Sequence, residues 1–170
     1  MLRMETKRLR ICPATRDQME TFVAAEPDGE LKKAYTEMLS GCLQHPDQWQ
    51  WDALWMIGRK DGTHVGDLCF RGPGQNGAVE IGYGIVEEHR CQDYAAEMVD
   101  AAVDWALRQP GITCVEAETE SGNHQSRRVL EKCGFCPAGM PGKEGLRFSG
   151  QRIPCDQTDG EWAFRGTGQA

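Results

Sequence analysis

The chain has no long apolar run and no excess of positive charge. Its longest uninterrupted apolar stretch is only a few residues, whereas a membrane-spanning helix needs about 20. The segment Met1 to Lys7 contains no apolar core of signal-peptide length, so we expect a cytoplasmic protein without membrane partners. The formal net charge of −7 argues against nucleic acid as the main partner and favours cationic or amine ligands.

Internal repeats, linkers and dense cysteine spacing are also missing. Eight cysteines are too few for a disulfide scaffold of this length and predict reduced thiols. Cys133 and Cys136 form a C-x-x-C pair, but a zinc site needs a second pair, so we predict no metal. The 170 residues, 39% of them hydrophobic, predict one domain over residues 1–166 and a frayed tail at 167–170.

Helical spacing of apolar residues predicts four helices. Thr15 and Gln18 form a capping box before the first. The second carries an apolar stripe that we expect to face a core, formed by Leu31, Ala34, Tyr35, Met38, Leu39 and Cys42. The third is expected at about 95–108 and the fourth at about 124–133, where Gly134 is a natural stop.

Alternating or short apolar runs predict strands between these helices. They lie at residues 8–11, 54–57, 65–70, 79–86, 114–119 and 161–164, with a hairpin turn at Asp61-Gly62. Trp49, Trp51 and Trp55 are predicted to pack in the core or, alternatively, to form an aromatic wall. Helices first, then antiparallel strands, then strand–helix–strand–helix predict an α+β fold with a mixed sheet.

The strand at residues 79–86 has one packing face and one nearly empty face. The empty face offers Glu80, Gly82 and Gly84. Two glycines on one face indicate that a ligand or a neighbouring helix comes close to the backbone, or that the strand contains a bulge. The strand leads through a short loop into a helix, and backbone N–H groups at a helix N-terminus can hold phosphate.

Three segments carry family motifs. Glu80–Ile85 with Arg90–Glu97 resembles an acetyl-CoA motif, (Gln/Arg)-x-x-Gly-x-(Gly/Ala). Asn123–Phe135 resembles the signature Asn-x-x-Ser-x-x-x-Leu-Glu-Lys-x-Gly-Phe, and Glu5–Arg10 resembles a Glu-Thr-x-Arg-Leu opening. The chain is therefore similar to the GNAT superfamily of N-acetyltransferases, in its RimJ/RimL-like branch.

The resemblance implies a mixed, strongly twisted sheet of about six to seven strands flanked by helices. Acetyl-CoA, the co-substrate, would lie between two splayed parallel strands, without a metal. The backbone of Ile85 and Val86 would pair with the pantetheine arm. Asn123 would hydrogen-bond the cofactor, and Ser126 would lie close to the thioester sulfur. The pyrophosphate would be cradled by the amides of Arg90, Cys91, Gln92, Asp93, Tyr94 and Ala95.

Asp93 departs from the motif, because it stands where the family has glycine. A carboxylate about 5 Å from a phosphate would weaken binding roughly a hundredfold at an effective dielectric near 20. As a helix N-cap, Asp93 could instead occupy the amides that the pyrophosphate needs. If the carboxylate points to solvent, binding survives in weakened form.

The implied reaction is direct attack of a primary amine on the thioester in a ternary complex. The acceptor could be a protein N-terminus, a polyamine or another small amine. Glu80 is the first candidate for the base, directly or through water, or else it is a salt-bridged strand residue; His89 is the second. Leu130 stands where many relatives have a tyrosine acid, so either Ser126 interacts with the thiolate or it only packs.

Two readings of the function remain. The first is an acetyl-CoA-dependent N-acetyltransferase, as a monomer or homodimer. The alternative is a catalytically degenerate relative that acts as a binding or regulatory module, its cofactor loop closed by Asp93. The glycine-rich stretch 139–150 is expected to form a loop near the acceptor site.

Overall fold

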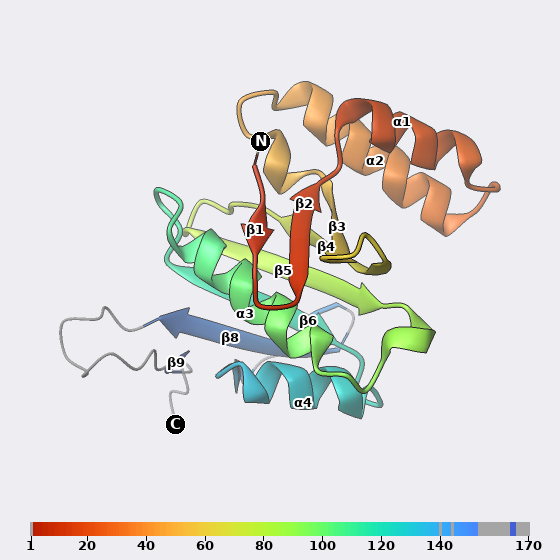
Figure 1. The fold of residues 1–170 in the computed structure, drawn as a ribbon. Coiled ribbons are helices and arrows are strands. Elements are labelled where there is room, and N and C mark those ends of the chain that lie inside the picture. The colour runs from red at the N-terminus through yellow and green to blue at the C-terminus, as the bar shows by residue number, and fades with distance from the viewer. Residues whose placement is uncertain (1, 140, 144, 153–163, 166–170) are drawn as a thin grey trace.

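A computed structural model describes residues 2–139, 141–143, 145–152 and 164–165. A central sheet carries helices on both faces (Figure 1). The helices are α1 (Arg16–Ala25), α2 (Glu30–Gln44), α3 (Tyr94–Leu107) and α4 (His124–Lys132), with 3-10 turns η1 (Trp49–Trp51) and η2 (Glu87–His89). The strands are β1 (Met4–Glu5), β2 (Leu9–Pro13), β3 (Leu54–Arg59), β4 (His64–Arg71), β5 (Ala78–Ile85), β6 (Cys114–Thr119), β7 (Cys136–Pro137), β8 (Leu146–Arg152) and β9 (Phe164–Arg165).

The strand order confirms the predicted α+β fold with a mixed sheet. It runs β1-β2-β3-β4-β5-β6-β8-β7, and β9 pairs with β8. Within the described residues every pair is antiparallel except β5–β6, which is parallel because α3 crosses between the two strands. No helix in this described part of the chain has both the length and the apolar character that crossing a membrane requires.

Local signals set the helix ends as the sequence predicts. The Thr15 hydroxyl accepts from the Gln18 amide and the Gln18 side chain accepts from the Thr15 amide, which completes the capping box of α1. Gly134 follows α4 with a φ of +81°, a conformation that favours glycine. The turn of the β3–β4 hairpin likewise contains Gly62 at a φ of +91°.

The main core lies between the sheet and α3. Its centre is an aromatic cluster in which the Trp105 ring lies 4.9 Å from Trp51, 4.8 Å from Trp55 and 5.3 Å from Phe70 between centroids. Trp51 and Trp55 are buried, so for these two residues the core-packing alternative is correct. Truncating such a buried tryptophan to alanine costs about 3–5 kcal/mol, and the cluster therefore fixes α3 against β3 and β4.

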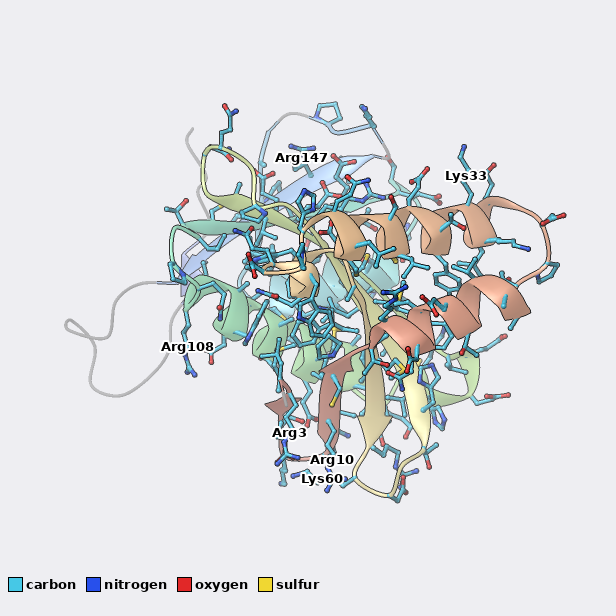
Figure 2. All side chains as sticks on the ribbon, turned by 90° about the horizontal axis from the view of Figure 1, so that it is seen from above. Arg3, Arg10, Lys33, Lys60, Arg108 and Arg147 are labelled. Carbon is cyan, nitrogen blue, oxygen red and sulfur yellow. The ribbon has the colours of Figure 1, made fainter. Side chains whose placement is uncertain are left out.

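The opposite face of the sheet is covered by α1 and α2, which lie side by side (Figures 1 and 2). Met19 of α1 is fully buried there, against Leu54 of β3. The stripe on α2 faces this smaller core as predicted, since Tyr35, Met38 and Leu39 pack against it, although no residue of α2 is fully buried. Leu31 is 50% exposed and Leu43 51%, since α2 packs mainly on α1 and not on the sheet.

The sheet opens at its middle. β5 pairs with β6 only from Ala78–Glu80 to Cys114–Glu116. Beyond these three residue pairs β5 continues to Ile85 and β6 to Thr119 without further pairing to each other. The two parallel strands therefore diverge toward their C-terminal ends, which is the wedge that the resemblance implies.

The sheet has more strands than expected. The two-residue strands β1 and β7 are added at the two edges of the sheet, and strands this short leave no alternating pattern in the sequence. β8 replaces part of the loop expected at 139–150, because its residues pair with β6 over Val115–Thr119. Of the strand expected at 161–164, residues 161–163 lie outside the described residues, as does the tail at 167–170.

Candidate functional site

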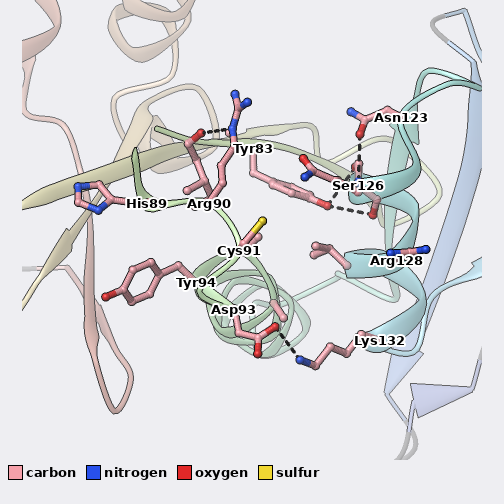
Figure 3. A pocket seen from close by; sticks show the side chains of 16 residues that line it. Tyr83, His89, Arg90, Cys91, Asp93, Tyr94, Asn123, Ser126, Arg128 and Lys132 are labelled. Atoms are coloured by element: carbon pink, nitrogen blue, oxygen red, sulfur yellow. Dashed lines mark hydrogen bonds and ion pairs between the residues drawn. The ribbon is translucent and has the colours of Figure 1, made fainter. Parts of the chain in front are cut away.

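A cleft of about 660 Å³ lies at the open side of β5 (Figure 3). Its walls are the end of β5, the loop that follows it, the first turn of α3 and one face of α4. Ile85, Arg90, Cys91, Asp93, Tyr94, Ala95, Asn123 and Ser126 from the predicted site all line it. The fold thus brings together residues from two sequence motifs that are more than 25 positions apart.

The loop before α3 turns its backbone sharply. Cys91 and Asp93 both have a φ of 60°, a left-handed conformation that aspartate tolerates better than most non-glycine residues. The Glu97 amide donates to the Asp93 carbonyl, four residues earlier, and this is the first hydrogen bond of helix α3. The amides of Tyr94, Ala95 and Ala96 therefore precede the first helical hydrogen bond, as in an anion-binding helix N-terminus.

Asp93 does not occupy these amides. It is the N-cap residue of α3, but its side chain makes no capping hydrogen bond. Its Oδ1 instead accepts from Lys132 Nζ of α4 at 2.8 Å, across the mouth of the cleft (Figure 3). The hydrogen bond from Lys132, and then its charge, lower the pKa of Asp93. The hypothesis that the carboxylate closes the amide end as a cap is therefore wrong.

The opening motif of the chain holds this loop from behind. Arg8 Nη1 donates to the Gln92 carbonyl at 2.9 Å, and the guanidinium lies 4.5 Å from the centroid of the Tyr94 ring. Arg8 Nε also pairs with Glu97 of α3 at 2.6 Å. Burial raises the pKa of Glu97, but hydrogen bonds from Thr6 and Arg8, with the Arg8 charge, outweigh it and lower the pKa overall. Sequence reasoning noted this motif without seeing that it contacts the loop.

The backbone of β5 is only partly available to a ligand. The Val86 amide donates to the Val65 carbonyl at 2.9 Å, and the Val86 carbonyl accepts from the His89 amide at 2.9 Å. Because hydrogen-bonding direction alternates along an antiparallel strand, Tyr83 and Ile85 turn their backbone groups toward the open side. There the Ile85 carbonyl accepts from Arg90 Nε at 3.2 Å. The expectation for Val86 is thus corrected, since both of its backbone groups are engaged within the protein.

Tyr83 and Ser126 face each other in the cleft. The Tyr83 hydroxyl lies 3.1 Å from Ser126 Oγ, joining β5 to α4 (Figure 3). Burial raises the pKa of Tyr83 to about 12 despite the hydrogen bond with Ser126, and Cys133 contributes further. Asn123 is the N-cap of α4, where its Oδ1 accepts from the Ser126 amide at 3.0 Å. Sequence reasoning missed Tyr83, because its alternation with apolar residues marked it as a packing residue.

Glu80 does not line this cleft. Side chains of a strand point alternately to its two faces, so Glu80, three positions before Tyr83, points to the other face of β5. On that face Arg71 Nη1 lies 3.4 Å from Glu80 Oε1. It is the last residue of β5 that pairs with β6, opposite Glu116. Arg147 of β8, labelled in Figure 2, contacts Glu116 at 3.3 Å and also Glu118. Of the two predicted base candidates, only His89 lies at the cleft itself.

The family model for the acetyltransferase (GNAT) domain matches residues 8–136. The chain belongs to the GNAT acetyltransferase family. The matched range contains β2 through the start of β7, and with them every residue of the cleft. The resemblance read from the sequence motifs is thus confirmed.

Two curated relatives of this GNAT domain come from Bacillus subtilis (strain 168). The N-acetyltransferase YjdG is 36% identical over 83 residues, which are 48% of this chain and 49% of YjdG. The N-acetyltransferase YoaA is 31% identical over 88 residues, 51% of this chain and 50% of YoaA. The chain spans about half the length of the curated relatives it matches.

Solved structures share the fold of this GNAT domain at low identity. An acetyltransferase from Agrobacterium tumefaciens has a TM-score of 0.66 at 21% identity, covering 88% of this chain and 94% of that one. The ribosomal-protein-S5-alanine acetyltransferase from Vibrio fischeri has a TM-score of 0.68 at 14% identity, covering 94% and 100%. The spermidine N-acetyltransferase from Vibrio cholerae, in complex with CoA and spermine, has a TM-score of 0.65 at 13% identity, covering 85% and 95%.

Cys133, the first cysteine of the C-x-x-C pair, has a structural role in this GNAT domain. Cys133 is buried, its thiol donates to the Ala96 carbonyl at 3.5 Å, and burial raises its pKa. Its sulfur therefore helps to join α4 to α3. Among the described residues, no three His, Cys, Asp or Glu side chains are grouped so that they could hold a metal ion.

Proposed function

We propose that this GNAT domain transfers acetyl from acetyl-CoA to a primary amine, by direct attack in a ternary complex. The observation that carries the proposal is the divergence of β5 from β6 over a cleft that ends at the first amides of α3. An extended acyl-thioester arm fits a strand edge without a partner, and a pyrophosphate fits a helix N-terminus.

The cofactor would lie along the cleft with its pyrophosphate at α3 and its thioester at the start of α4. Its pyrophosphate would bind the amides of Tyr94, Ala95 and Ala96, with the loop Arg90–Asp93 around it. The pantetheine arm would pair with the backbone amide of Ile85 on the open side of β5, and with its carbonyl once the Arg90 side chain turns from it to the pyrophosphate. Asn123 and Ser126 at the start of α4 would then border the thioester. The Asp93–Lys132 ion pair supports this placement, because it turns the carboxylate away from the amides.

The acceptor amine would approach from the opposite face of β5. Glu80 stands on that face at the point where the strands part, and Glu116 and Glu118 lie beside it on β6. Within the described residues, the three carboxylates face the two guanidinium groups of Arg71 and Arg147, which leaves a net negative charge that favours a protonated amine. A carboxylate at the parting point can take the amine's proton directly or through water. We therefore propose Glu80 as the general base, with a cationic primary amine as acceptor.

Calorimetric titration with acetyl-CoA is the first test, followed by an acetylation assay on an amine panel. The panel includes spermidine and peptides with a free N-terminal alanine, the acceptors that the names of two structural neighbours indicate. We expect micromolar binding and turnover of at least one amine. No binding up to millimolar acetyl-CoA would contradict the proposal and favour a degenerate relative that acts as a binding or regulatory module.

A matched pair of variants makes the binding test specific to the cleft. Ala95→Glu places a carboxylate at the first turn of α3, where it suits the helix but repels a pyrophosphate. Ala24→Glu makes the same change on exposed α1. We expect Ala95→Glu to abolish acetyl-CoA binding and Ala24→Glu to leave it unchanged. Equal affinities for both variants would place the cofactor elsewhere.

A further inference from the structure

The departing CoA sulfur needs a hydrogen-bond donor, and Leu130 cannot supply one. Its aliphatic side chain is fully buried, where α4 contributes to the main core. When the amine attacks the thioester, a C–N bond forms and the C–S bond breaks, so the electron pair of that bond goes to sulfur. A thiolate released in a partly closed cleft is stabilised by a nearby O–H group, as any developing anion is.

We infer that Tyr83 is the hydrogen-bond donor to the departing CoA thiolate, with Ser126 as its partner. The inference rests on the proposed acetyl transfer. The Tyr83 hydroxyl lies in the cleft at 3.1 Å from Ser126 Oγ and 3.4 Å from the Ser126 carbonyl. One hydroxyl comes from the strand that would hold the pantetheine arm, and the other from the helix that borders the thioester (Figure 3).

The surroundings of Tyr83 keep its proton in place. Burial of the ring raises the pKa of the phenol to about 12, so the group stays an O–H donor at any pH at which the enzyme works. During the reaction Ser126 Oγ–H donates to the Tyr83 oxygen while Tyr83 O–H turns to the sulfur. One ammonium proton of the acceptor goes to the base before the attack, and the second N–H proton passes to water as the tetrahedral intermediate collapses to the amide. CoA leaves as a thiolate held by Tyr83, and it takes a proton from water afterwards.

The test compares Tyr83→Phe with the wild type and with Tyr35→Phe. Tyr35 is a matched control, because it is also partly buried and its pKa is also raised by burial, but it lies on the α1–α2 side of the sheet. We expect Tyr83→Phe to lower kcat by about 10- to 100-fold, the range for a lost hydrogen bond to a charged group. The Kd for acetyl-CoA should change by less than about threefold, since the ground-state thioester carries no charge. Tyr35→Phe should change neither quantity.

A second measurement separates donation to sulfur from a structural effect. Titration of the CoA product in its complex, followed by the ultraviolet absorbance of the thiolate, gives the pKa of the bound thiol. A donor at the sulfur lowers this pKa, so Tyr83→Phe should raise it while Tyr35→Phe leaves it unchanged. This measurement needs only CoA binding and no identified acceptor.

The outcomes are distinct. An unchanged thiol pKa in Tyr83→Phe, or an unchanged kcat, would overturn the inference while the proposed transfer stands. A fall in kcat matched by an equal rise in Kd would show that Tyr83 only packs against the cofactor, and would overturn it too. Failure of the wild-type protein to bind CoA or acetyl-CoA would overturn the proposed function, and this inference with it.

Discussion

Asp93 and Lys132 decide together whether the cofactor loop accepts a pyrophosphate. The Asp93 backbone adopts the left-handed conformation that glycine would supply, and its carboxylate is held by Lys132 at 2.8 Å. The pair is exposed, at 74% for the Asp93 side chain and 59% for Lys132, so solvent screens it. The substitution of glycine by aspartate is thus compensated both in conformation and in charge.

This pairing predicts that removing Lys132 harms binding more than removing Asp93 helps it. Lys132→Met leaves the Asp93 carboxylate uncompensated beside the phosphates, so the Kd for acetyl-CoA should rise up to about fivefold, as for an exposed ion pair. Asp93→Gly alone should change it by less than about threefold. Asp93→Gly added to Lys132→Met should restore most of the loss. Calorimetric titration measures all four proteins, and a large gain in Asp93→Gly alone would show that the carboxylate still obstructs the site.

Glu80 is the second position whose role a single substitution can test. If it accepts the proton of the acceptor, Glu80→Gln should lower kcat about 100-fold or more at neutral pH while acetyl-CoA affinity stays the same. The defect should shrink as the pH approaches the pKa of the amine itself, because the free amine then needs no base. Glu37→Gln on exposed α2 is the control. A defect that is constant across pH would remove Glu80 as the base and leave its ion pair with Arg71 as its role.

Single residues also show where sequence reasoning succeeds. Thr15, Gln18 and Gly134 act within a few positions of themselves, so their capping and stop roles are legible in the sequence and are confirmed. Tyr83 is different, because its partner Ser126 lies 43 positions away. Alternation assigned Tyr83 correctly to the core-side face of β5, but it could not show that this face meets α4 at an open cleft.

At the scale of elements, the N-terminal strands serve the cofactor loop through α3. Thr6 and Arg8, between β1 and β2, both hydrogen-bond the Glu97 carboxylate in the first turn of α3. Glu97 itself is only 18% exposed, so these bonds join the edge of the sheet to the helix that begins at the cleft. The edge strands therefore help to fix the amides on which pyrophosphate binding would depend.

The connection predicts a pH-dependent contribution to stability. The pKa of Glu97 is lowered in the folded state from a reference of 4.5, so its ionised form stabilises the protein above that pH. Glu97→Gln should reduce the free energy of unfolding at pH 7 by about 1–3 kcal/mol, the range for hydrogen bonds to a charged group. The difference should vanish as the pH falls below 4.5 through the folded-state pKa.

Chemical denaturation at several pH values measures this difference, and Glu20→Gln serves as the control. Glu20 pairs with Arg16 on the exposed surface of α1, so its substitution should have little effect at any pH. A wild-type advantage over Glu97→Gln that persists undiminished well below pH 4 would show that packing, and not the ionised carboxylate, joins Thr6 and Arg8 to α3.

Two elements mark the limit of what local patterns predict. The stripe on α2 faces a core as its spacing predicts, yet none of its residues is fully buried, since helical periodicity shows the preferred side of a helix but not how closely a partner covers it. β8 was expected to be loop because glycines surround it. It forms because its backbone pairs with β6, about 30 positions earlier in the chain, and Arg147 meets Glu116 and Glu118 across this pairing.

At the scale of the molecule, the fold consists of two sheet halves that meet along a short seam. The first half runs from β1 to β5, the second comprises β6, β8 and β7, and only three residue pairs of β5 and β6 connect them within the described sheet. Family motifs in the sequence predicted both the parting strands and the cleft. They could not predict that Val86 is engaged within the protein, because that depends on the register of β5 against β4.

The short seam predicts that acetyl-CoA stabilises both halves at once. A ligand at a hundred times its Kd stabilises the folded state by about 2.7 kcal/mol, and each kcal/mol corresponds to about 2–4 °C in a protein of this size. The thermal midpoint should therefore rise by about 5–10 °C. Because the ligand would bridge the open end of β5 in the first half to α4 in the second, hydrogen exchange should slow in β5 and α4 as well as in α3. Protection confined to the loop and the first turn of α3 would mean that the ligand rests on the helix end alone and that the parted strands do not hold it.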